Sequence, residues 1–290
     1  IAPGAVIELA SGTYNLSDYL READGEVSDY VRGSFSSDGW QADIFDVTDL
    51  TIRGAKDGPV EVVTEPRYAD VLCFNACSEI TIENITFGHT IGKGNCEGSV
   101  LEFDHCRDIA LEKLDLYGCG TYGVDAAFTS GLALKDCTIR ECSYGIIDLR
   151  FCSDITATDC TFKDNEGYDL LSLYNSFIDF DGCVFTGNEG QNFLPFRSED
   201  NGARFTRCSF DRWESRHLNE ELKGSGSYLI GEDCSFDIAV GKRIVHAENM
   251  EQLIESIAPD TTILIAPGKS AKRIKQLISR SGSGTIKTAL

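Results

Sequence analysis

Four consecutive stretches of equal length align with one another without gaps. They read CRDIALEKLDLYGCGTYGVDAAF (106–128), TSGLALKDCTIRECSYGIIDLRF (129–151), CSDITATDCTFKDNEGYDLLSLY (152–174) and NSFIDFDGCVFTGNEGQNFLPFR (175–197). Their constant length, which we call the repeat period, is typical of a solenoid, in which each repeat forms one turn of a coil. Each stretch contains three short segments of alternating apolar residues, and such alternation is typical of strands. The repeats therefore predict a coil with three strands in every turn.

Several columns of equivalent residues are predicted to face the interior. One contains only cysteines, namely Cys137, Cys160, Cys183, Cys208 and Cys234; another, on the third strand, contains Ile147, Leu149 and Phe151 and, one repeat later, Leu170, Ser172 and Tyr174. Reduced cysteine packs as a small hydrophobic residue, so we expect a stack of buried thiols. The chain has 12 cysteines but no Cys-x-x-Cys pair, which disfavours a zinc site. Disulfides are disfavoured in this column because each bond pairs two thiols, so five thiols would leave one unpaired.

Turn residues separate the strand segments in a regular way. Asn84, Asp136 and Asp159 follow the first segment of their repeats, and Asn-x-Gly turns recur at 165–167 and 188–190. In this pattern, and in the opening stretch GAVIELASGTYNL (4–16), the chain resembles the right-handed parallel β-helix, or pectin-lyase-like, superfamily over residues 4–236. The resemblance implies an all-β fold, a right-handed parallel β-helix solenoid. It does not imply one activity, because this superfamily contains lyases, hydrolases, epimerases, phage spikes and non-catalytic modules.

The C-terminal part of the chain departs from the repeat. We expect the β-helix over residues 1–240 and a small α/β extension or cap over residues 241–290. Apolar residues at helical spacing predict helices over 250–257 and 270–282, with a strand at 262–265 between them. Residues 258–268 also match residues 2–12 at five of eleven positions. The extension therefore either caps the coil or begins another one, in which case the chain is an excerpt of a longer protein.

The charge balance argues against some partners. The chain has 290 residues, of which 47 are acidic and 26 basic, giving a net charge of −21. A protein this acidic is unsuited to holding nucleic acid by its phosphates, so we expect no nucleic-acid partner. No apolar run approaches the roughly 18 residues of a membrane-spanning helix, so we expect no membrane partner. Free thiols favour a reducing compartment, whereas the resemblance favours secretion, so localisation stays open.

Three insertions interrupt the regular period, at 15–41, 89–98 and 211–226. All three fall in the turn that leads into the third strand of the repeat, which we call the front strand. Long loops at one edge of a rigid scaffold often carry function. The alternative is that this turn only tolerates insertions.

Acidic residues gather on the outward face predicted for the front strands. One outward column reads Asp43, Cys73, Glu102, Asp125, Asp148, Leu171 and Leu194, and its neighbour reads Phe45, Asn75, Asp104, Ala127, Arg150, Leu173 and Phe196. Carboxylates on successive turns repel one another unless something compensates. A Ca²⁺ ion held by Glu102, Asp125 and Asp148 is one such compensation, and a proton retained by one carboxyl is another. After Asp148 we expect this face to become apolar and to be covered.

This acidic column predicts a site for carbohydrate chemistry. Carboxyls on adjacent turns lie roughly 5 Å apart and those on alternate turns about 10 Å, which brackets the separations in retaining and inverting glycosidases. We expect Asp125 and Asp148 to act as an acid–base pair. The pectin-cleaving enzymes of the superfamily carry acidic residues and an Arg or Lys base on this face, so the resemblance implies that Arg150 is a base or a substrate clamp. The candidate substrate ligands are Glu102, Asp104, His105 and Lys93.

We therefore expect a protein that binds or cleaves a polysaccharide or oligosaccharide, as a lyase or a hydrolase, in an acidic groove on the front sheet. The Asp-Asp, His-Gly and Arg-x-Lys signatures of polygalacturonases are absent from the turns that would carry them, and no lyase motif is complete. The alternative is a non-catalytic structural, adhesion or protein-interaction module. A third hypothesis is an acidic β-helix that mimics nucleic acid toward a basic partner. Apart from Ca²⁺, no cofactor is expected.

Overall fold

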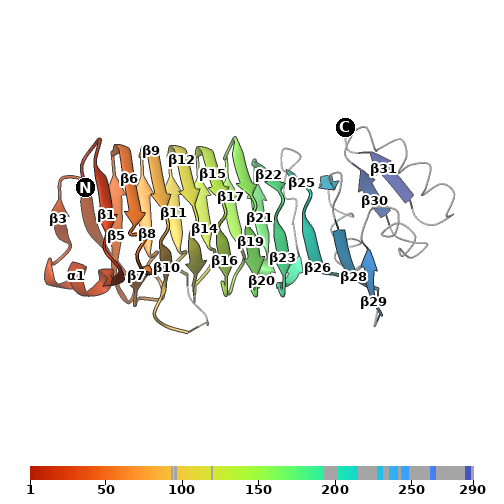
Figure 1. Cartoon of the computed structure of the whole chain (residues 1–290), viewed down its shortest axis with the longest axis horizontal. Coiled ribbons are helices and arrows are strands. Elements are labelled where there is room, and N and C mark those ends of the chain that lie inside the picture. Colours follow the sequence, from red (N-terminus) through yellow and green to blue (C-terminus); the bar gives the residue numbers. More distant parts are fainter. Residues whose placement is uncertain are drawn as a thin grey trace.

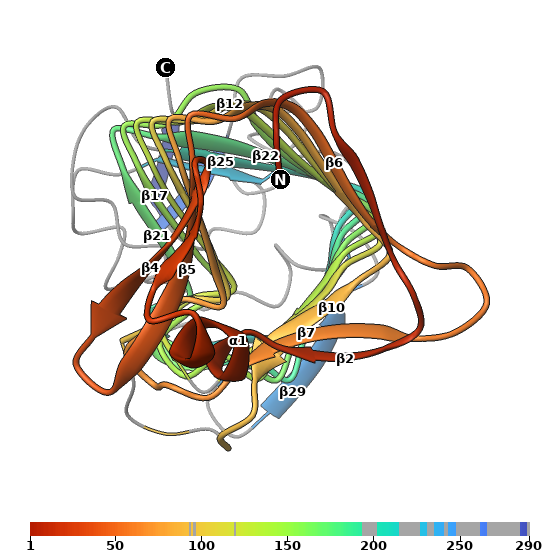
Figure 2. The same cartoon turned by 90° about the vertical axis from the view of Figure 1, so that its left-hand side faces the viewer.

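The computed structural model describes residues 1–92, 94, 97–118, 120–192 and 202–214, and the strands at 227–230, 235–240, 243–247, 262–265 and 285–288. The chain winds into a coil whose turns stack along the long axis, with the N-terminus at one end (Figure 1). Seen along that axis, the coil has three sides (Figure 2). Each side is a sheet whose strands come from successive turns. The predicted all-β parallel solenoid is confirmed.

Three long sheets form the sides of the coil. Sheet A has the order β1 (Val6–Leu9), β6 (Thr48–Gly54), β9 (Ser78–Glu83), β12 (Arg107–Glu112), β15 (Ser130–Lys135), β18 (Ile155–Thr158), β22 (Phe177–Asp181), β25 (Gly202–Thr206) and β27 (Ser227–Ile230). Sheet B has the order β2 (Gly12–Asn15), β7 (Val60–Thr64), β10 (Thr86–His89), β13 (Asp115–Tyr117), β16 (Thr138–Arg140), β19 (Thr161–Lys163), β23 (Val184–Thr186), β26 (Ser209–Glu214), β28 (Ser235–Val240) and β29 (Arg243–Ala247). The front sheet has the order β21 (Leu171–Tyr174), β17 (Ile147–Arg150), β14 (Val124–Ala127), β11 (Leu101–Asp104), β8 (Leu72–Asn75), β5 (Gly39–Phe45), β4 (Val31–Ser36) and β3 (Glu26–Ser28).

Smaller elements complete the described part of the chain. They are the helix α1 (Leu16–Glu22) and two parallel pairs of strands, β20 (Glu166–Asp169) with β24 (Glu189–Asn192) and β30 (Thr262–Ile265) with β31 (Thr285–Thr288). The strand pairs β3–β4, β4–β5 and β28–β29 are antiparallel.

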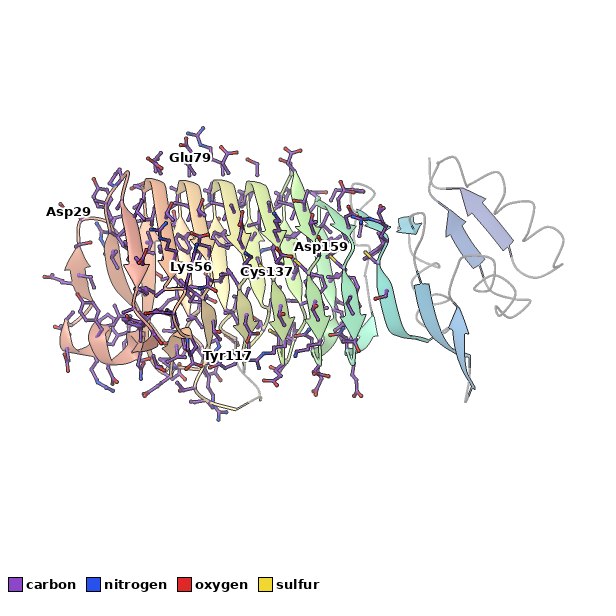
Figure 3. All side chains as sticks on the ribbon, viewed as in Figure 1. Asp29, Lys56, Glu79, Tyr117, Cys137 and Asp159 are labelled. Atoms are coloured by element: carbon purple, nitrogen blue, oxygen red, sulfur yellow. The ribbon has the colours of Figure 1, made fainter. Side chains whose placement is uncertain are left out.

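Alternating side chains fill the interior of the coil. In β11, Leu101 and Phe103 are buried, whereas Glu102 and Asp104 are half-buried and lie on the outward face. Phe103 stacks on Phe74 of the preceding turn with ring centroids 5.2 Å apart. Charged side chains such as Glu79 project from the outside of the coil (Figure 3). Loss of a buried aromatic ring from such a core costs roughly 3–5 kcal/mol, so these stacks are a main source of stability.

The described cysteines are buried free thiols, and most of them lie in the interior of the coil, whereas Cys73 lies on the outward face of β8. All nine of them are buried and unpaired by disulfides. The thiols of Cys137, Cys183 and Cys208 donate to carbonyl oxygens of the preceding turn at 3.3–3.6 Å. The predicted thiol stack is confirmed from Cys137 to Cys208, and Cys234 lies outside the described residues. Each of these three thiols thus has a backbone oxygen of the preceding turn as a hydrogen-bond partner.

A second interior column mixes thiols with hydroxyls. The Cys106 thiol donates to the Phe74 carbonyl oxygen at 3.4 Å, and one turn later the Thr129 hydroxyl donates to the Phe103 carbonyl oxygen at 3.2 Å. The Thr129 Oγ1 atom also accepts a hydrogen bond from the Cys106 amide at 3.1 Å. This position therefore requires a small side chain that can donate a hydrogen bond to a carbonyl oxygen of the preceding turn. Cysteine and threonine both meet this requirement.

Positive backbone dihedral angles occur at the predicted turn residues. The φ values of Asn84, Asp136 and Asp159 are 57°, 53° and 52°. Asn and Asp tolerate this left-handed conformation better than other residues with a side chain. The turns between the first and second strands of each repeat are thus confirmed.

In one turn of the coil, the repeat period is broken on the front sheet but is kept on the other two sheets. Asp148 pairs with Ser172, one position later than the repeat period predicts, whereas the equivalent pairs in sheets A and B keep that period. The turn before β21 is one residue longer than its equivalent, and the turn after it is one residue shorter. Leu171 and Leu173 are therefore buried, while Ser172 and Tyr174 face outward. The expectation of an apolar face after Asp148 is wrong, because a shift of one residue exchanges the two faces of a strand.

Two insertions lead into the front sheet as predicted. The first forms α1 and the strands β3 and β4 before β5; the second, at 89–98, joins β10 to β11. Asn15 caps α1, because its Oδ1 atom accepts a hydrogen bond from the Ser17 amide at 3.1 Å. Leu20 of α1 is buried, and the helix packs against β5 and β7 at the N-terminal end of the coil (Figure 2). Most of the third insertion, residues 215–226, lies outside the described residues.

The C-terminal part of the chain is described only at its strands. The predicted strand at 262–265 is β30, and β31 pairs with it one repeat period later. The predicted helices at 250–257 and 270–282 lie outside the described residues, as do Leu194 and Phe196 of the outward columns. The domain boundary at 240 stays a prediction. Within the described part of the chain, no helix has the length and apolar character needed to cross a membrane.

Candidate functional site

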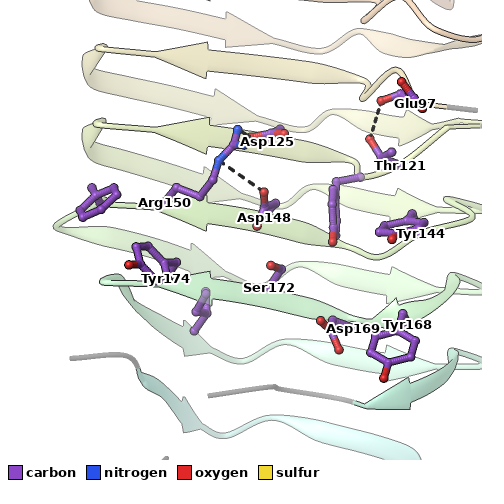
Figure 4. Close-up of a pocket in the computed structure, with 13 residues that line it drawn as sticks. Glu97, Thr121, Asp125, Tyr144, Asp148, Arg150, Tyr168, Asp169, Ser172 and Tyr174 are labelled. Carbon is purple, nitrogen blue, oxygen red and sulfur yellow. Dashed lines mark hydrogen bonds and ion pairs between the residues drawn. The ribbon is translucent and has the colours of Figure 1, made fainter. Parts of the chain in front are cut away.

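A groove opens on the front sheet across β14, β17 and β21 (Figure 4). It encloses about 620 Å³, a volume typical of sites that bind small organic molecules. The residues that line it are Glu97, Thr121, Tyr122, Asp125, Tyr144, Asp148, Arg150, Phe151, Tyr168, Asp169, Ser172, Leu173 and Tyr174. Three of the residues expected at the site, Asp125, Asp148 and Arg150, are therefore brought together in one groove.

Asp125, Asp148 and Arg150 form one charged cluster. Asp125 of β14 and Asp148 of β17 are direct strand partners, and Arg150 lies two residues beyond Asp148 on the same face. The Arg150 Nη2 atom donates to Asp125 Oδ1 at 2.6 Å, and its Nε atom lies 3.5 Å from Asp148 Oδ2. The side chains of Asp125 and Asp148 are only 18% and 13% exposed. Two poorly solvated carboxyls thus share one guanidinium group.

The environment of Asp125 changes its affinity for a proton. Burial raises the pKa of the Asp125 carboxyl, the charge of Asp148 raises it further, and the nearby Arg150 guanidinium opposes both. The resulting pKa is about 7, compared with 3.8 for an ordinary aspartate. A carboxyl with such a pKa is present in both protonated and ionised forms near neutral pH. It can therefore give and take a proton there, as a general acid–base group must.

Glu102 lies one strand before Asp125 but interacts with a different partner. It is the strand neighbour of Asp125 and Cys73, and its carboxyl is hydrogen-bonded to Asp70. Burial raises the pKa of Asp70 well above its ordinary value, and the hydrogen bond and charge of Glu102 raise it further. The Ser99 amide donates to Asp70 Oδ1 at 2.5 Å. Asp70 was not predicted, because it precedes β8 in a turn and has no place in the alternating columns.

The other predicted ligands lie away from the groove. Asp104 and His105 are at the end of β11, where His105 Nδ1 lies 2.9 Å from Asp104 Oδ1. The His105 ring stacks on Phe128 with centroids 4.8 Å apart. Neither Asp104 nor His105 lines the groove, and Lys93 lies outside the described residues. Their roles as substrate ligands stay predictions.

Exposed aromatic side chains border the groove on two sides. Tyr144, on the turn that leads into β17, and Tyr168, on β20, are 52% and 54% exposed. Tyr174, which is 42% exposed, lies across the groove from them (Figure 4). Phe151, which is 46% exposed, also lines the groove and its ring contacts that of Tyr174 with centroids 5.1 Å apart. Phe151 stacks on Phe128 with centroids 5.1 Å apart and ring planes within 2° of parallel. The groove therefore has acidic groups between two aromatic borders.

The prediction that Phe151, Ser172 and Tyr174 face the interior is wrong. Phe151 follows the last residue of β17 and has a φ of 57°, so the alternation of the strand does not extend to it. Tyr174 faces outward because of the one-residue shift of β21. A signal for this border does exist in the sequence, since Phe128, Phe151 and Tyr174 recur at the repeat period.

The arrangement of the carboxyls bears on the predicted Ca²⁺ site. Among the described residues, no group of three or more His, Cys, Asp or Glu side chains is placed to hold a metal ion. Asp125 and Asp148 already contact Arg150, and Glu102 is hydrogen-bonded to Asp70. This arrangement does not fit Ca²⁺, which needs six to eight oxygen ligands around one position. A cation here would have to displace the guanidinium group.

Comparisons with known proteins identify the fold family. The solved structures similar to this chain include a pectate lyase from Paenibacillus sp. 0602, with 8% identity, a TM-score of 0.50, and coverage of 83% of this chain and 74% of that one. They also include a candidate glycosyl hydrolase from Parabacteroides merdae ATCC 43184, with 10% identity, a TM-score of 0.39, and coverage of 67% and 87%. At these identities the likeness concerns the fold alone. No curated protein sequence matches the chain. Residues 70–234, more than half of the chain, match the family described as right handed beta helix region, and the chain belongs to that family.

Proposed function

We propose that the protein binds a polysaccharide or oligosaccharide in the front-sheet groove and hydrolyses it with Asp125 and Asp148. The observation that carries this proposal is the pair of poorly solvated carboxyls on adjacent strands, beside one guanidinium, in a groove of about 620 Å³. The shared fold with a pectate lyase supports a carbohydrate ligand in general. It does not specify the sugar or the reaction.

The strand geometry favours hydrolysis through a covalent intermediate. Neighbouring strands of a sheet lie about 4.8 Å apart, so the two carboxyls are close to the separation of about 5–5.5 Å found in retaining glycosidases. In this mechanism Asp125 gives its proton to the glycosidic oxygen as the bond to the leaving sugar breaks. The Asp148 carboxylate attacks the anomeric carbon and forms a glycosyl ester. Asp125 then takes a proton from water, which attacks the same carbon and releases Asp148.

Arg150 suits the role of a charge partner better than that of a base. Burial lowers the pKa of its guanidinium, but the Asp125 and Asp148 carboxylates outweigh this effect, so the pKa is raised above its usual value. A guanidinium held protonated in this way does not accept a proton from a sugar carbon. This supports hydrolysis over the lyase reaction, in which a base removes such a proton. It also supports a role for Arg150 in orienting the two carboxyls.

The test is to assay Asp125→Asn and Asp148→Asn for cleavage of a panel of polysaccharides by release of reducing ends. Loss of an acid–base group lowers the rate by roughly 10²–10⁴-fold, and we expect losses in that range for both variants. Asp136→Asn, in a turn outside the groove, is the matched control and retains the wild-type rate. Thermal unfolding curves establish that all three variants fold. Wild-type rates for both groove variants would disprove the catalytic roles.

A second candidate function is a non-catalytic adhesion or interaction module. The observation that favours it is the exposed aromatic row formed by Phe128, Phe151 and Tyr174, which continues onto the His105 ring. Aromatic residues are enriched where proteins bind partners. In that case the chain would bind its partner without cleaving it, Asp125→Asn would bind normally, and Phe151→Ala would lose binding. Cleavage of any glycan by the wild-type chain would exclude this function as the sole one.

A further inference from the structure

We infer that the glycan segment entering the groove carries no carboxylates and is built of neutral or amino sugars rather than uronic acids. This inference rests on the proposed function and names the substrate class of the same groove. It runs against what the shared fold with a pectate lyase would suggest. Three features of the groove carry it: its charge, the engagement of its arginine and its aromatic borders.

The lining of the groove is strongly acidic. It contains the carboxyl groups of Glu97, Asp125, Asp148 and Asp169, and Arg150 is the one cation among the described lining residues. A site for a uronic acid needs positive groups to replace the water around the sugar carboxylate. Here a second carboxylate would enter a space that already has an excess of negative charge. Repulsion at such distances, in a partly buried site, weakens binding by more than a factor of ten.

Arg150 is already engaged by the protein. Recognition of a carboxylate by arginine commonly uses two parallel N–H donors on one edge of the guanidinium. In this groove the Nη2 atom donates to Asp125 at 2.6 Å and the Nε atom faces Asp148 at 3.5 Å. A uronate that took over this guanidinium would leave two poorly solvated aspartates without their counter-charge. The arginine therefore does not serve as the clamp for an acidic sugar.

The acidic character continues along the coil axis. The outward residues of the next strands are Glu102 on β11, Cys73 on β8 and Asp43 on β5. A long glycan that follows the front sheet from the groove toward β5 therefore meets the carboxyls of Glu102 and Asp43, with Cys73 between them. A polyuronate would be repelled along this whole path.

The aromatic borders suit the kind of sugar that the charge favours. Sugar rings present apolar C–H faces, and exposed aromatic rings are the side chains that bury such faces best. Tyr144 and Tyr168 on one side, with Phe151 and Tyr174 on the other, could each cover a sugar ring that lies over the acidic floor. An ammonium group of an amino sugar would also be attracted to the ring faces and to the carboxylates. Neutral and amino sugars thus find favourable contacts at every wall of the groove.

The experiment compares pairs of ligands in which a charged group is present or is masked by a small neutral substituent. The full chain is titrated calorimetrically, with chelator present, against oligogalacturonate and its methyl ester, and against oligomers of glucosamine and N-acetylglucosamine; uncharged galactan, xylan and mannan oligomers complete the panel. We expect the methyl ester to bind at least tenfold tighter than the free acid. We expect glucosamine oligomers to bind at least as tightly as their acetylated forms at low salt, with an advantage that shrinks as salt screens the charges. Tighter binding of the free acid than of its ester would overturn the inference.

Matched variants locate the effect in the groove. Glu97→Lys exchanges a carboxylate for a cation at the rim and should raise affinity for oligogalacturonate about 3–10-fold, whereas Glu79→Lys, outside the groove, should change it less than twofold. Tyr168→Ala should weaken binding of neutral glycans at least tenfold, and Tyr19→Ala on α1, which is 56% exposed, should not. Equal effects in the groove variants and their controls would overturn the inference. Cleavage of uronates alone would overturn the substrate class but not the proposed function, and no binding of any glycan would overturn both.

Discussion

Two carboxyl pairs lie on the same face of the front sheet but are stabilised in different ways. Asp70 and Glu102 share a hydrogen bond, and burial raises the pKa of Asp70 well above its ordinary value. Asp125 and Asp148 instead share the guanidinium of Arg150, and the pKa of Asp125 reaches about 7. The raised pKa of Asp70 keeps its carboxyl protonated to a higher pH than usual, whereas the Asp125 carboxyl, beside a cation, can exchange a proton near neutrality. The first arrangement suits structure and the second suits proton transfer.

The largest effect expected from this difference is on the pH dependence of stability. Below about pH 4 Asp125 is protonated in both the folded and unfolded chain and contributes nothing. As the pH rises, the unfolded chain loses this proton first, because the pKa of Asp125 is raised to about 7 in the fold. The free energy of unfolding should therefore fall between about pH 4 and pH 7, by at most about 4 kcal/mol from this residue, and then level off. Urea unfolding at a series of pH values measures this fall in the free energy of unfolding.

Asp125→Asn provides the comparison for that measurement. The variant keeps an oxygen that can accept from Arg150 but has no proton to lose, so the fall in stability up to pH 7 should become smaller. Asp136→Asn serves as the control and should leave the curve unchanged. An identical pH dependence in wild type and Asp125→Asn would mean that the second pair does not titrate near neutrality, and the contrast between the pairs would disappear.

A smaller effect is expected when the cation is removed. Arg150→Met leaves the two aspartates without a counter-charge, so the chain should lose about 1–2 kcal/mol of stability at pH 8, an amount reduced by the partial exposure of Arg150. At pH 4 the loss should be smaller, because Asp125 is then protonated and needs no counter-charge. Denaturant unfolding at the two pH values checks this prediction. A loss that is equal at both would show that Arg150 stabilises the fold by packing instead.

The smallest effect is expected at the pair joined by a proton. Asp70→Asn replaces a protonated carboxyl by an amide of the same shape, which still accepts from the Ser99 amide. Stability at pH 3.5 should change by less than about 0.5 kcal/mol, and as the pH rises above about 4 the variant should gain relative to wild type because it has no proton to lose. Asp70→Ala removes the acceptor and should cost about 1–3 kcal/mol. Equal losses in both variants would show that Asp70 is ionised in the fold.

The fold and the centre of the groove could be predicted from the sequence because both depend on one spacing. Strand partners one repeat period apart hold from β11 to β17, and this places Asp125, Asp148 and Arg150 on one face. The prediction failed at β21, where a longer turn before the strand and a shorter one after it cancel. Such a pair of changes leaves the overall period intact, so counting residues cannot detect it. Only the burial of Leu171 and Leu173 reveals the shift.

The rest of the groove could not be predicted because it comes from residues outside the front strands, in turns and in β20. Glu97, Tyr144 and Tyr168 lie outside the front strands, where alternation carries no information about direction. Phe151 shows the limit of the pattern most clearly: one residue past the end of β17, a left-handed backbone sends outward a side chain that the alternation assigns to the interior. Asp70 also could not be predicted, because its raised pKa comes from burial and from a contact with Glu102 in another turn, and no sequence motif marks such a contact.

The buried thiols have one more consequence. Cys137, Cys160, Cys183 and Cys208 lie one to a turn along the axis, and an alkylating reagent can reach each only when its own turn opens. In a solenoid every turn contacts only its neighbours, so the ends can unwind before the middle. The order in which these cysteines become alkylated would reveal the direction of unwinding. The native chain thus carries its own series of position-specific reporters, without any engineered label.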